Sequence, residues 1–244
     1  MSKINLYIDC TSGISGDMLC KCLVSLCGDG SFVEEQQNWV SDELLQEQQE
    51  HHHEHQHGDA DKHHTHAYSH RSFQSILTML SGCGLDENVK AMVLKTYTIL
   101  AIAEAEVHGE TLETVHFHEV GRPQAIINMV GIAAALVAMN PDKVFCSEII
   151  DGTGTVQCAH GEILVPVPAV LALMKGSNLR FSTEDVRMEM VTPTGLAALL
   201  AMEPLYMEAH PEARTIVEAA GATGDRKDPD NGLHRGLKIT LFRG

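Results

Sequence analysis

The sequence predicts an α/β or α+β fold in which a mixed sheet is flanked by helices and interrupted by a mobile, histidine-rich insertion. Short β-rich runs alternate with segments of helical periodicity along the chain. Apolar residues make up 44% of the 244 residues, which is enough to build a core. We therefore expect one domain over residues 1–244, with a low-complexity acidic and histidine-rich insertion over 31–70.

The first elements follow from the residues at the amino terminus. The run Lys3–Asp9 is typical of a short strand, and a Gly/Ser-rich loop follows it. Apolar residues then recur at helical spacing up to Leu26, with Ser15 as the expected N-cap. The polar residues from Ser31 to about Ser69 contain little core-forming material and predict a mobile insertion or linker.

The remaining elements are bounded by capping residues, glycines and prolines. Asp86 is the expected N-cap of a long helix that Gly109 closes, and Thr192 with Pro193 opens another helix. We also expect helices over 73–80, 124–139 and 168–175, and strands over 144–150, 163–165, 188–191, 215–217 and 237–242.

Charge and composition restrict the partners and the compartment. The formal net charge is −16, and ten acidic residues but no Lys or Arg lie between Lys21 and Lys62. Such a segment repels nucleic acids and anionic membranes, so we expect neither partner. No window approaches the run of about 18 apolar residues that a membrane span needs, and no secretory signal begins the chain. The cytoplasm is the expected location, and the seven cysteines, without a CxxC pair, are expected to be reduced and mostly buried.

A dense histidine tract dominates the acidic segment. It holds nine of the 15 histidines, and imidazole is a common ligand of Ni²⁺, Cu²⁺ and Zn²⁺. We interpret the tract as a metal-binding segment that needs no fixed fold. An expression tag and a solvated spacer are the alternatives. The candidate metal ligands are His51, His52, His53, His55, His57, His63, His64, His66 and His70.

Two segments are candidates for binding phosphate. In the loop after the first strand, glycines let backbone N–H groups approach an anion, and the helix N-terminus adds a favourable dipole. The helix start at Thr192 offers hydroxyl groups and free N–H groups in the same way. An ordinary tight turn and a well-built N-cap are the respective alternatives. The candidate residues are Asp9, Ser12, Gly13, Ser15, Gly16 and Asp17 in the loop, and Thr192, Thr194 and Gly195 at the second helix start.

Two further segments carry candidate catalytic residues. In an extended His116-Phe-His118-Glu119 segment, both imidazoles point to one face, where they could share a metal ion. Glu119 could ligate the ion or act as a base. His160 lies in a Cys-Ala-His-Gly turn and is either catalytic or part of a loop cap. Hydrogen-bonded structural histidines are the alternative for the first pair.

Taken together and in order, these segments resemble the LarC family of nickel-pincer cofactor biosynthesis proteins. The resemblance rests on LYIDCTSGISGDML, the histidine-rich insertion, AEAEVHGETLETVHFHEVG, GTVQCAHGEILVPVPAVLALMKG and MVTPTGLAALL. The family is the nickel insertion protein for pyridinium-3,5-bisthiocarboxylic acid mononucleotide. The sequence differs from the usual family pattern after HFHEVG, where Gln124 and Asn128 replace two aspartates.

The resemblance implies CTP-dependent cyclometallation by a nickel chelatase or lyase. Nickel is placed between two thiocarboxylate sulfurs and a pyridinium carbon, and CTP is hydrolysed with Mg²⁺ or Mn²⁺ in a region expected outside this chain. This chain is then the nickel-handling N-terminal part, with a possible C-terminal partner chain and a possible homo-oligomer. His116, His118, Glu119 or His160 would supply the base or a transient nickel ligand. A non-catalytic nickel-binding or storage module and a diverged phosphate-binding enzyme are the alternative functions.

Overall fold

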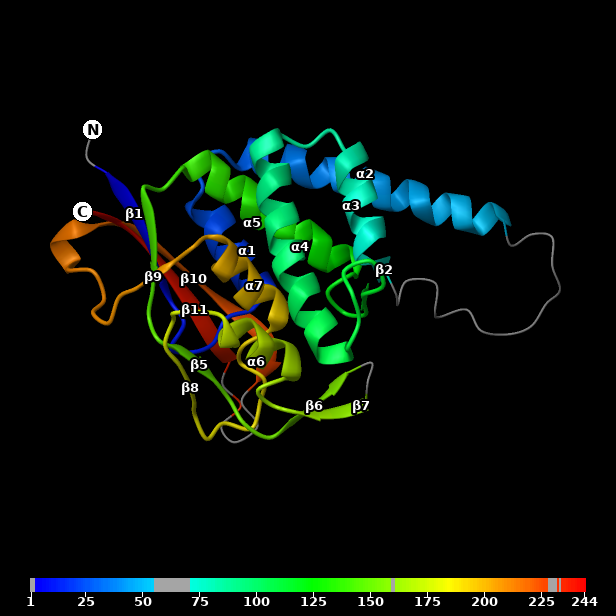
Figure 1. Ribbon diagram of the computed structural model, residues 1–244. Coiled ribbons are helices and arrows are strands. Elements are labelled where there is room, and N and C mark those ends of the chain that lie inside the picture. Colours follow the sequence, from blue (N-terminus) through cyan, green and yellow to red (C-terminus); the bar gives the residue numbers. More distant parts are fainter. Residues whose placement is uncertain (1–2, 55–70, 159–160, 228–231, 233) are drawn as a thin grey trace.

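A mixed five-stranded sheet forms one side of the computed structural model, which describes residues 3–54, 71–158, 161–227, 232 and 234–244. Strand β1 lies at its centre, antiparallel to β11 and parallel to β4 (Figure 1). The predicted α/β class is confirmed. The strands run in the order β10 (Ile216–Lys227), β11 (His234–Arg243), β1 (Ile4–Asp9), β4 (Lys143–Cys146) and β9 (Leu205–Tyr206).

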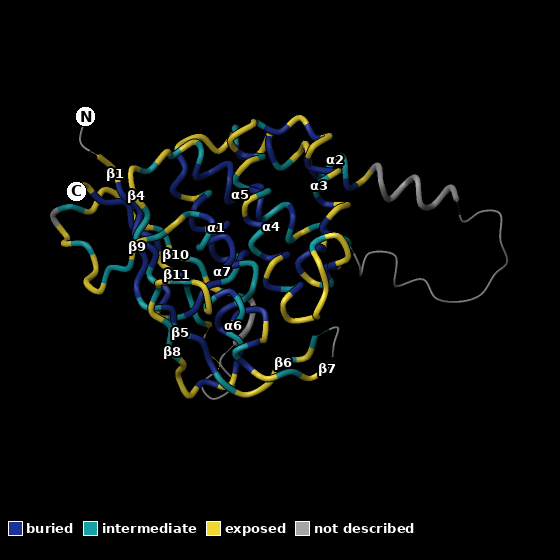
Figure 2. The backbone as a smooth tube through the Cα atoms, in the orientation of Figure 1, coloured by how far each residue is buried: buried dark blue, intermediate teal, exposed yellow. Residues whose placement is uncertain are grey.

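The helices pack together beside this sheet, with α5 at the centre of the helical layer (Figure 1). Helix α5 contacts α1, α2, α4 and α7, and its apolar residues are buried around most of its circumference. Figure 2 shows the buried backbone concentrated in this layer and in the central strands. The helices are α1 (Gly16–Leu26), α2 (Gly30–Glu54), α3 (Phe73–Gly82), α4 (Glu87–His108), α5 (Pro123–Met139), α6 (Pro168–Lys175) and α7 (Pro193–Ala201).

The predicted caps are present. The Ser15 hydroxyl accepts a hydrogen bond from the Met18 N–H at the start of α1, and the Asp86 carboxylate accepts from two N–H groups of α4. Gly109 closes α4 in the left-handed conformation with a φ of 65°. Side-chain capping residues and a left-handed glycine are local signals, so the sequence locates these helix ends well.

The prediction of a mobile insertion over 31–70 is wrong for its first part. Gly30–Glu54 form helix α2, which packs against α5 and buries Val33, Val40 and Leu44. The apolar residues are sparse but recur at helical spacing, so a narrow stripe reaches the core while the rest of the helix is polar. Residues 55–70 lie outside the described residues.

Three small two-stranded sheets lie beside the main one. The run predicted as one strand over 144–150 is divided, because the chain leaves the main sheet after β4 and pairs elsewhere as β5. The segment 188–191 is not a strand: only Val191 forms an isolated bridge, to Ile14. The small sheets are β2 (Arg71–Ser72) with β3 (His116–Phe117), β5 (Ile149–Asp151) with β8 (Phe181–Thr183), and β6 (Thr155–Cys158) with β7 (Gly161–Leu164).

Strand β10 is much longer than the predicted 215–217. Its glycines and alanines carry a weak strand pattern, and the pairing with β11, which includes register shifts, holds the segment extended.

All seven cysteines are free and all but Cys158 are buried, as predicted. Within the described part of the chain, none of the helices has the length and apolar character that crossing a bilayer requires.

Candidate active site

The N-termini of α1 and α7 lie against each other at the centre of the molecule. The loop before α1 joins the segment before α7 through the isolated parallel bridge between Ile14 and Val191. The Ile14 N–H donates to the Met190 carbonyl at 2.9 Å, and the Thr192 N–H donates to the Ile14 carbonyl at 3.0 Å. The two candidate phosphate segments of the sequence are therefore neighbours in space.

Two glycines permit this close approach. A Cβ atom on Gly13, whose φ is +88°, would lie 2.3 Å from the Met190 carbonyl oxygen. A Cβ atom on Gly195 would lie 2.7 Å from backbone atoms of Ser15. Because backbone atoms cannot move aside as side chains do, only glycine fits at either position.

The segment before α7 is held by a buried carboxylate. Asp151 has no exposed surface, and its Oδ1 accepts hydrogen bonds from the N–H groups of Gly152, Met190 and Val191 at 2.8–3.0 Å. These bonds replace the strand pairing that the apolar pattern of 188–191 predicted. Asp151 therefore fixes the position of Glu189 and Thr192, which lie on either side of the two bound residues.

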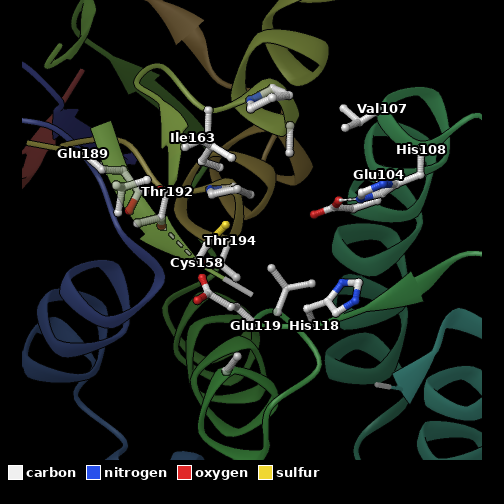
Figure 3. Close-up of a pocket in the computed structure, with 17 residues that line it drawn as sticks. Glu104, Val107, His108, His118, Glu119, Cys158, Ile163, Glu189, Thr192 and Thr194 are labelled. Carbon is white, nitrogen blue, oxygen red and sulfur yellow. Dashed lines mark hydrogen bonds and ion pairs between the residues drawn. The ribbon is translucent and has the colours of Figure 1, made fainter. Parts of the chain in front are cut away.

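A cavity of about 420 Å³ opens between α4, the loop after β3, the β6–β7 hairpin and the start of α7. Most of its lining is apolar, and Glu104 with His108 lies on the opposite side from Glu189 with Thr192 (Figure 3). The polar lining residues are Glu104 and His108 from α4, His118 and Glu119 from the loop after β3, Cys158 from β6, and Glu189, Thr192 and Thr194 beside and in α7.

Glu104 and His108 form a pair on the last turns of α4. The Nε2 atom of His108 lies 3.5 Å from the Oε2 atom of Glu104, one helical turn apart. The Glu104 side chain is 16% exposed. Burial raises the pKa of Glu104 above its ordinary value, the pair with His108 opposes the shift, and the charge of Glu119 adds to it.

We expect the Glu104→Gln substitution to stabilise the fold at neutral pH. A raised pKa means that the folded protein holds the Glu104 proton more tightly than the unfolded chain does, so the ionised carboxylate costs stability at higher pH. The gain should grow as the pH rises through the raised pKa of Glu104 and disappear as the pH falls below the ordinary glutamate range. Urea unfolding of both proteins between pH 4 and pH 7 measures this, and a pH-independent difference would contradict the assignment of the shift to Glu104.

A second, smaller cavity of about 180 Å³ lies at the N-terminus of α1. Ser12, Ser15 and Asp17 line it together with Arg235 from β11. Arg235 also lies 3.4 Å from a carboxylate oxygen of Glu184. Glu189 and Thr192 line both cavities, so the two share one wall.

The structure brings together some of the candidate residues and separates others. Only His118 and Glu119 of the HFHE segment line the large cavity, because β3 ends at Phe117 and the chain bends there, so the extended geometry predicted for both histidines is wrong. Asp9 does not line the small cavity, and its carboxylate accepts hydrogen bonds from the backbone N–H and the hydroxyl of Thr11. Gly13 and Gly195, which were predicted to bind phosphate, allow the two candidate phosphate segments to pack against each other.

The metal-binding prediction concerns residues that are largely outside the described part. His51, His52 and His53 end helix α2, whereas His160 and the tract residues His55, His57, His63, His64, His66 and His70 lie outside the described residues. Among the residues that the structure does describe, no three His, Cys, Asp or Glu side chains are grouped closely enough to hold a metal ion.

Sequence reasoning missed Glu104, Glu189 and Arg235. Glu104 and His108 carry the one available signal, an acid and an imidazole four residues apart on a helix. Nothing local marks Glu189 or Arg235, since each reaches the site through tertiary packing. Gln124 and Asn128 form a hydrogen bond on α5, in which Nε2 of Gln124 donates to Oδ1 of Asn128 at 3.0 Å.

Comparisons with known proteins agree on one family. The family model described as "Nickel insertion protein" matches residues 6–236. No solved structure is significantly similar to the chain.

Curated relatives carry related names. The chain is 37% identical over 205 residues to the pyridinium-3,5-bisthiocarboxylic acid mononucleotide nickel insertion protein of Acetivibrio thermocellus, covering 80% of this chain and 50% of the relative. It is 35% identical to the protein of the same name from Desulfitobacterium hafniense, covering 91% and 54% respectively. A putative nickel insertion protein of a Picosynechococcus species is 34% identical, with coverage of 92% and 59%. The chain thus spans about half the length of these relatives.

Proposed function

The chain belongs to the nickel insertion protein family, and from this premise we propose that it binds pyridinium-3,5-bisthiocarboxylic acid mononucleotide and takes part in placing nickel in it. The substrate is the one in the names of the Acetivibrio and Desulfitobacterium relatives. In this proposal nickel is a substrate that is delivered and transferred.

The observation that supports the proposal is the pair of adjoining cavities. The larger one is apolar over most of its lining and has room for an aromatic ring, with carboxylates and imidazoles facing its interior. The smaller one combines the hydroxyl groups of Ser12 and Ser15 with the guanidinium group of Arg235. Since arginine and hydroxyl groups suit phosphate, we place the ring in the larger cavity and the phosphate in the smaller one. The wall formed by Glu189 and Thr192 would then lie beside the link between them.

His118 and Glu119 are the polar groups that we place against the reacting ring. They line the same cavity as Glu189 and Thr192 (Figure 3). The histidine tract over 51–70 is proposed to supply nickel, because many imidazoles in a short segment can hold metal in several arrangements.

CTP hydrolysis and a partner chain belong to the same proposal. Among the described residues, no three His, Cys, Asp or Glu side chains are grouped to hold Mg²⁺ or Mn²⁺. The chain spans about half the length of its relatives, and we propose that the region corresponding to their remaining half, which a partner chain can supply, binds CTP.

The test is formation of the nickel–carbon product. The protein is mixed with Ni²⁺, CTP and the mononucleotide, with and without the proposed partner chain, and the product is followed by absorbance and mass spectrometry. Product that requires this chain supports the proposal, and omission of CTP tests the nucleotide requirement. Nickel binding without product in either mixture would favour the storage function instead.

Within this assay, we expect His118→Ala to lower kcat by at least about tenfold, a loss in the lower part of the range for side chains that contact a reacting group. His116→Ala is the matched control, since His116 is exposed and does not line the cavity. It should retain activity within about twofold, as exposed surface substitutions generally do. Equal losses in the two variants would contradict this placement of the substrate.

A further inference from the structure

Glu104 lies in the large cavity in a position that suits a proton acceptor. Its carboxylate group extends from α4 towards the interior of the cavity, across from Glu189 and Thr192 (Figure 3). Its side chain is only 16% exposed. Val107, on the same helix, and Ile163 are among the apolar side chains that line the cavity. A carboxylate in such surroundings loses most of its hydration.

Loss of hydration makes the carboxylate a stronger base. Burial is the largest cause of the raised pKa of Glu104, and the negative charge of Glu119 acts in the same direction. A general base is most effective when its pKa approaches the working pH. Of the other two acids of the cavity, Glu119 is exposed, and Glu189, which is half-buried like Glu104, lies at the wall shared with the small cavity.

His108 is placed to orient this base. Its Nε2 atom is 3.5 Å from Oε2 of Glu104, and its ring lies 6.4 Å from the ring of His118, measured between centroids. His108 is the last residue of α4, and the N–H group of the following Gly109 donates to the Ala105 carbonyl and closes the helix. The pair therefore holds one carboxylate oxygen in a defined direction.

We propose that Glu104 accepts the proton that the pyridinium carbon loses when nickel is bonded to it, and that His108 is the positioning residue for Glu104. This inference rests on the proposed function. The C–H bond breaks, its electron pair forms the carbon–nickel bond, and the proton passes to the Glu104 carboxylate. No oxidant or reductant is required, because Ni²⁺ keeps its oxidation state and the released proton leaves to solvent from the carboxylic acid.

The experiment uses the same product assay with substrate carrying hydrogen or deuterium at the reacting ring carbon. In Glu104→Gln we expect kcat to fall about 100-fold or more, as for loss of a general base, with KM changed less than about threefold. The deuterium isotope effect should increase, since proton removal becomes slower than every other step. In Glu104→Ala, added formate should restore part of the rate, because it can occupy the vacated space and accept the proton.

The matched control is Glu106→Gln, the same chemical change two residues away. Glu106 is outside the cavity and forms an exposed ion pair with Lys175 at 2.7 Å, so kcat should stay within about twofold. His108→Ala should lower kcat by about tenfold without changing KM, and His108→Gln, which can still donate to the carboxylate, should recover part of the loss.

The outcomes separate the two levels of the proposal. If the wild-type protein forms product and Glu104→Gln does so at the same rate, or if formate and the isotope effect show no response, Glu104 is not the base and the proposed function stands. If the wild-type protein neither binds the mononucleotide in calorimetry nor supports product formation, the proposed function fails, and the inference about Glu104 fails with it.

Discussion

Asp151→Ala should lower the free energy of unfolding by about 4 kcal/mol, since three buried N–H groups lose their common acceptor and each unsatisfied donor costs about 1–3 kcal/mol. The acceptor is one oxygen of a carboxylate that is completely buried. A loss of this size is a large part of the stability of an ordinary domain. Urea unfolding followed by circular dichroism measures it.

Two variants make this measurement specific. Asp151→Asn retains an acceptor oxygen of similar shape and should lose clearly less than the alanine variant. Asp185→Ala removes an exposed aspartate from the segment before α7 and should change stability by less than about 0.5 kcal/mol. If Asp151→Ala has the same urea midpoint of unfolding as the wild-type protein, the carboxylate does not hold the segment before α7 in place.

Gly13→Ala should destabilise the protein by about 3 kcal/mol and abolish binding of the mononucleotide. Its φ of +88° disfavours any L side chain, and the added Cβ would lie 2.3 Å from the Met190 carbonyl oxygen. Backbone strain contributes about 1 kcal/mol and overpacking about 1–3 kcal/mol. Relief of the contact must separate the two helix starts, which displaces Ser12 and Ser15 from the small cavity.

Two other glycines separate the effect of backbone strain from the effect of the contact with Met190. Gly109 has a φ of +65° with no atom near the added Cβ, so Gly109→Ala reports backbone strain alone and should cost about 1 kcal/mol. Gly28 has neither a positive φ nor a close neighbour, and Gly28→Ala should be nearly neutral. If Gly13→Ala costs no more than Gly109→Ala, the contact with Met190 is not a constraint. Unfolding midpoints and calorimetric binding of the mononucleotide measure both consequences.

The parts of the fold that the sequence predicted are those with local causes. The ends of α1, α4 and α7 were predictable, because the residue at each end acts on backbone only a few positions away. The side chains of Ser15, Asp86 and Thr192 accept hydrogen bonds from backbone N–H groups, and Gly109 turns the chain. Helix α2 was missed because only a narrow stripe, including Val33 and Val40, enters the core. The polar composition of the segment therefore led to the prediction of a mobile insertion rather than a helix.

The errors among the strands have a long-range cause. Whether 188–191 pairs with a strand depends on Asp151, which is some 40 residues away in the chain and takes the hydrogen bonds that a neighbouring strand would have made. The length of β10 depends in the same way on its pairing with β11. Neither partner can be identified from the local pattern.

The candidate site was predictable as a set of segments but not as a set of side chains. The loop before α1 reaches the small cavity, the HFHE segment reaches the large one, and Thr192 before α7 reaches both. Within them, the bend after Phe117 selects His118 over His116, and packing brings in Glu189 and Arg235, which no local signal marks. Side-chain direction at a bend and the approach of distant elements are properties of the assembled fold.

The wall that Glu189 and Thr192 form between the cavities has a thermodynamic consequence. A ligand that shifts this wall from one side changes the free energy of binding on the other side. Linkage requires the two effects to be equal: if phosphate in the small cavity strengthens ring binding in the large one by some factor, the ring strengthens phosphate binding by the same factor. The separate halves of the mononucleotide, a phosphate and a pyridinium ring, would therefore bind in a mutually dependent manner even without the bond that joins them.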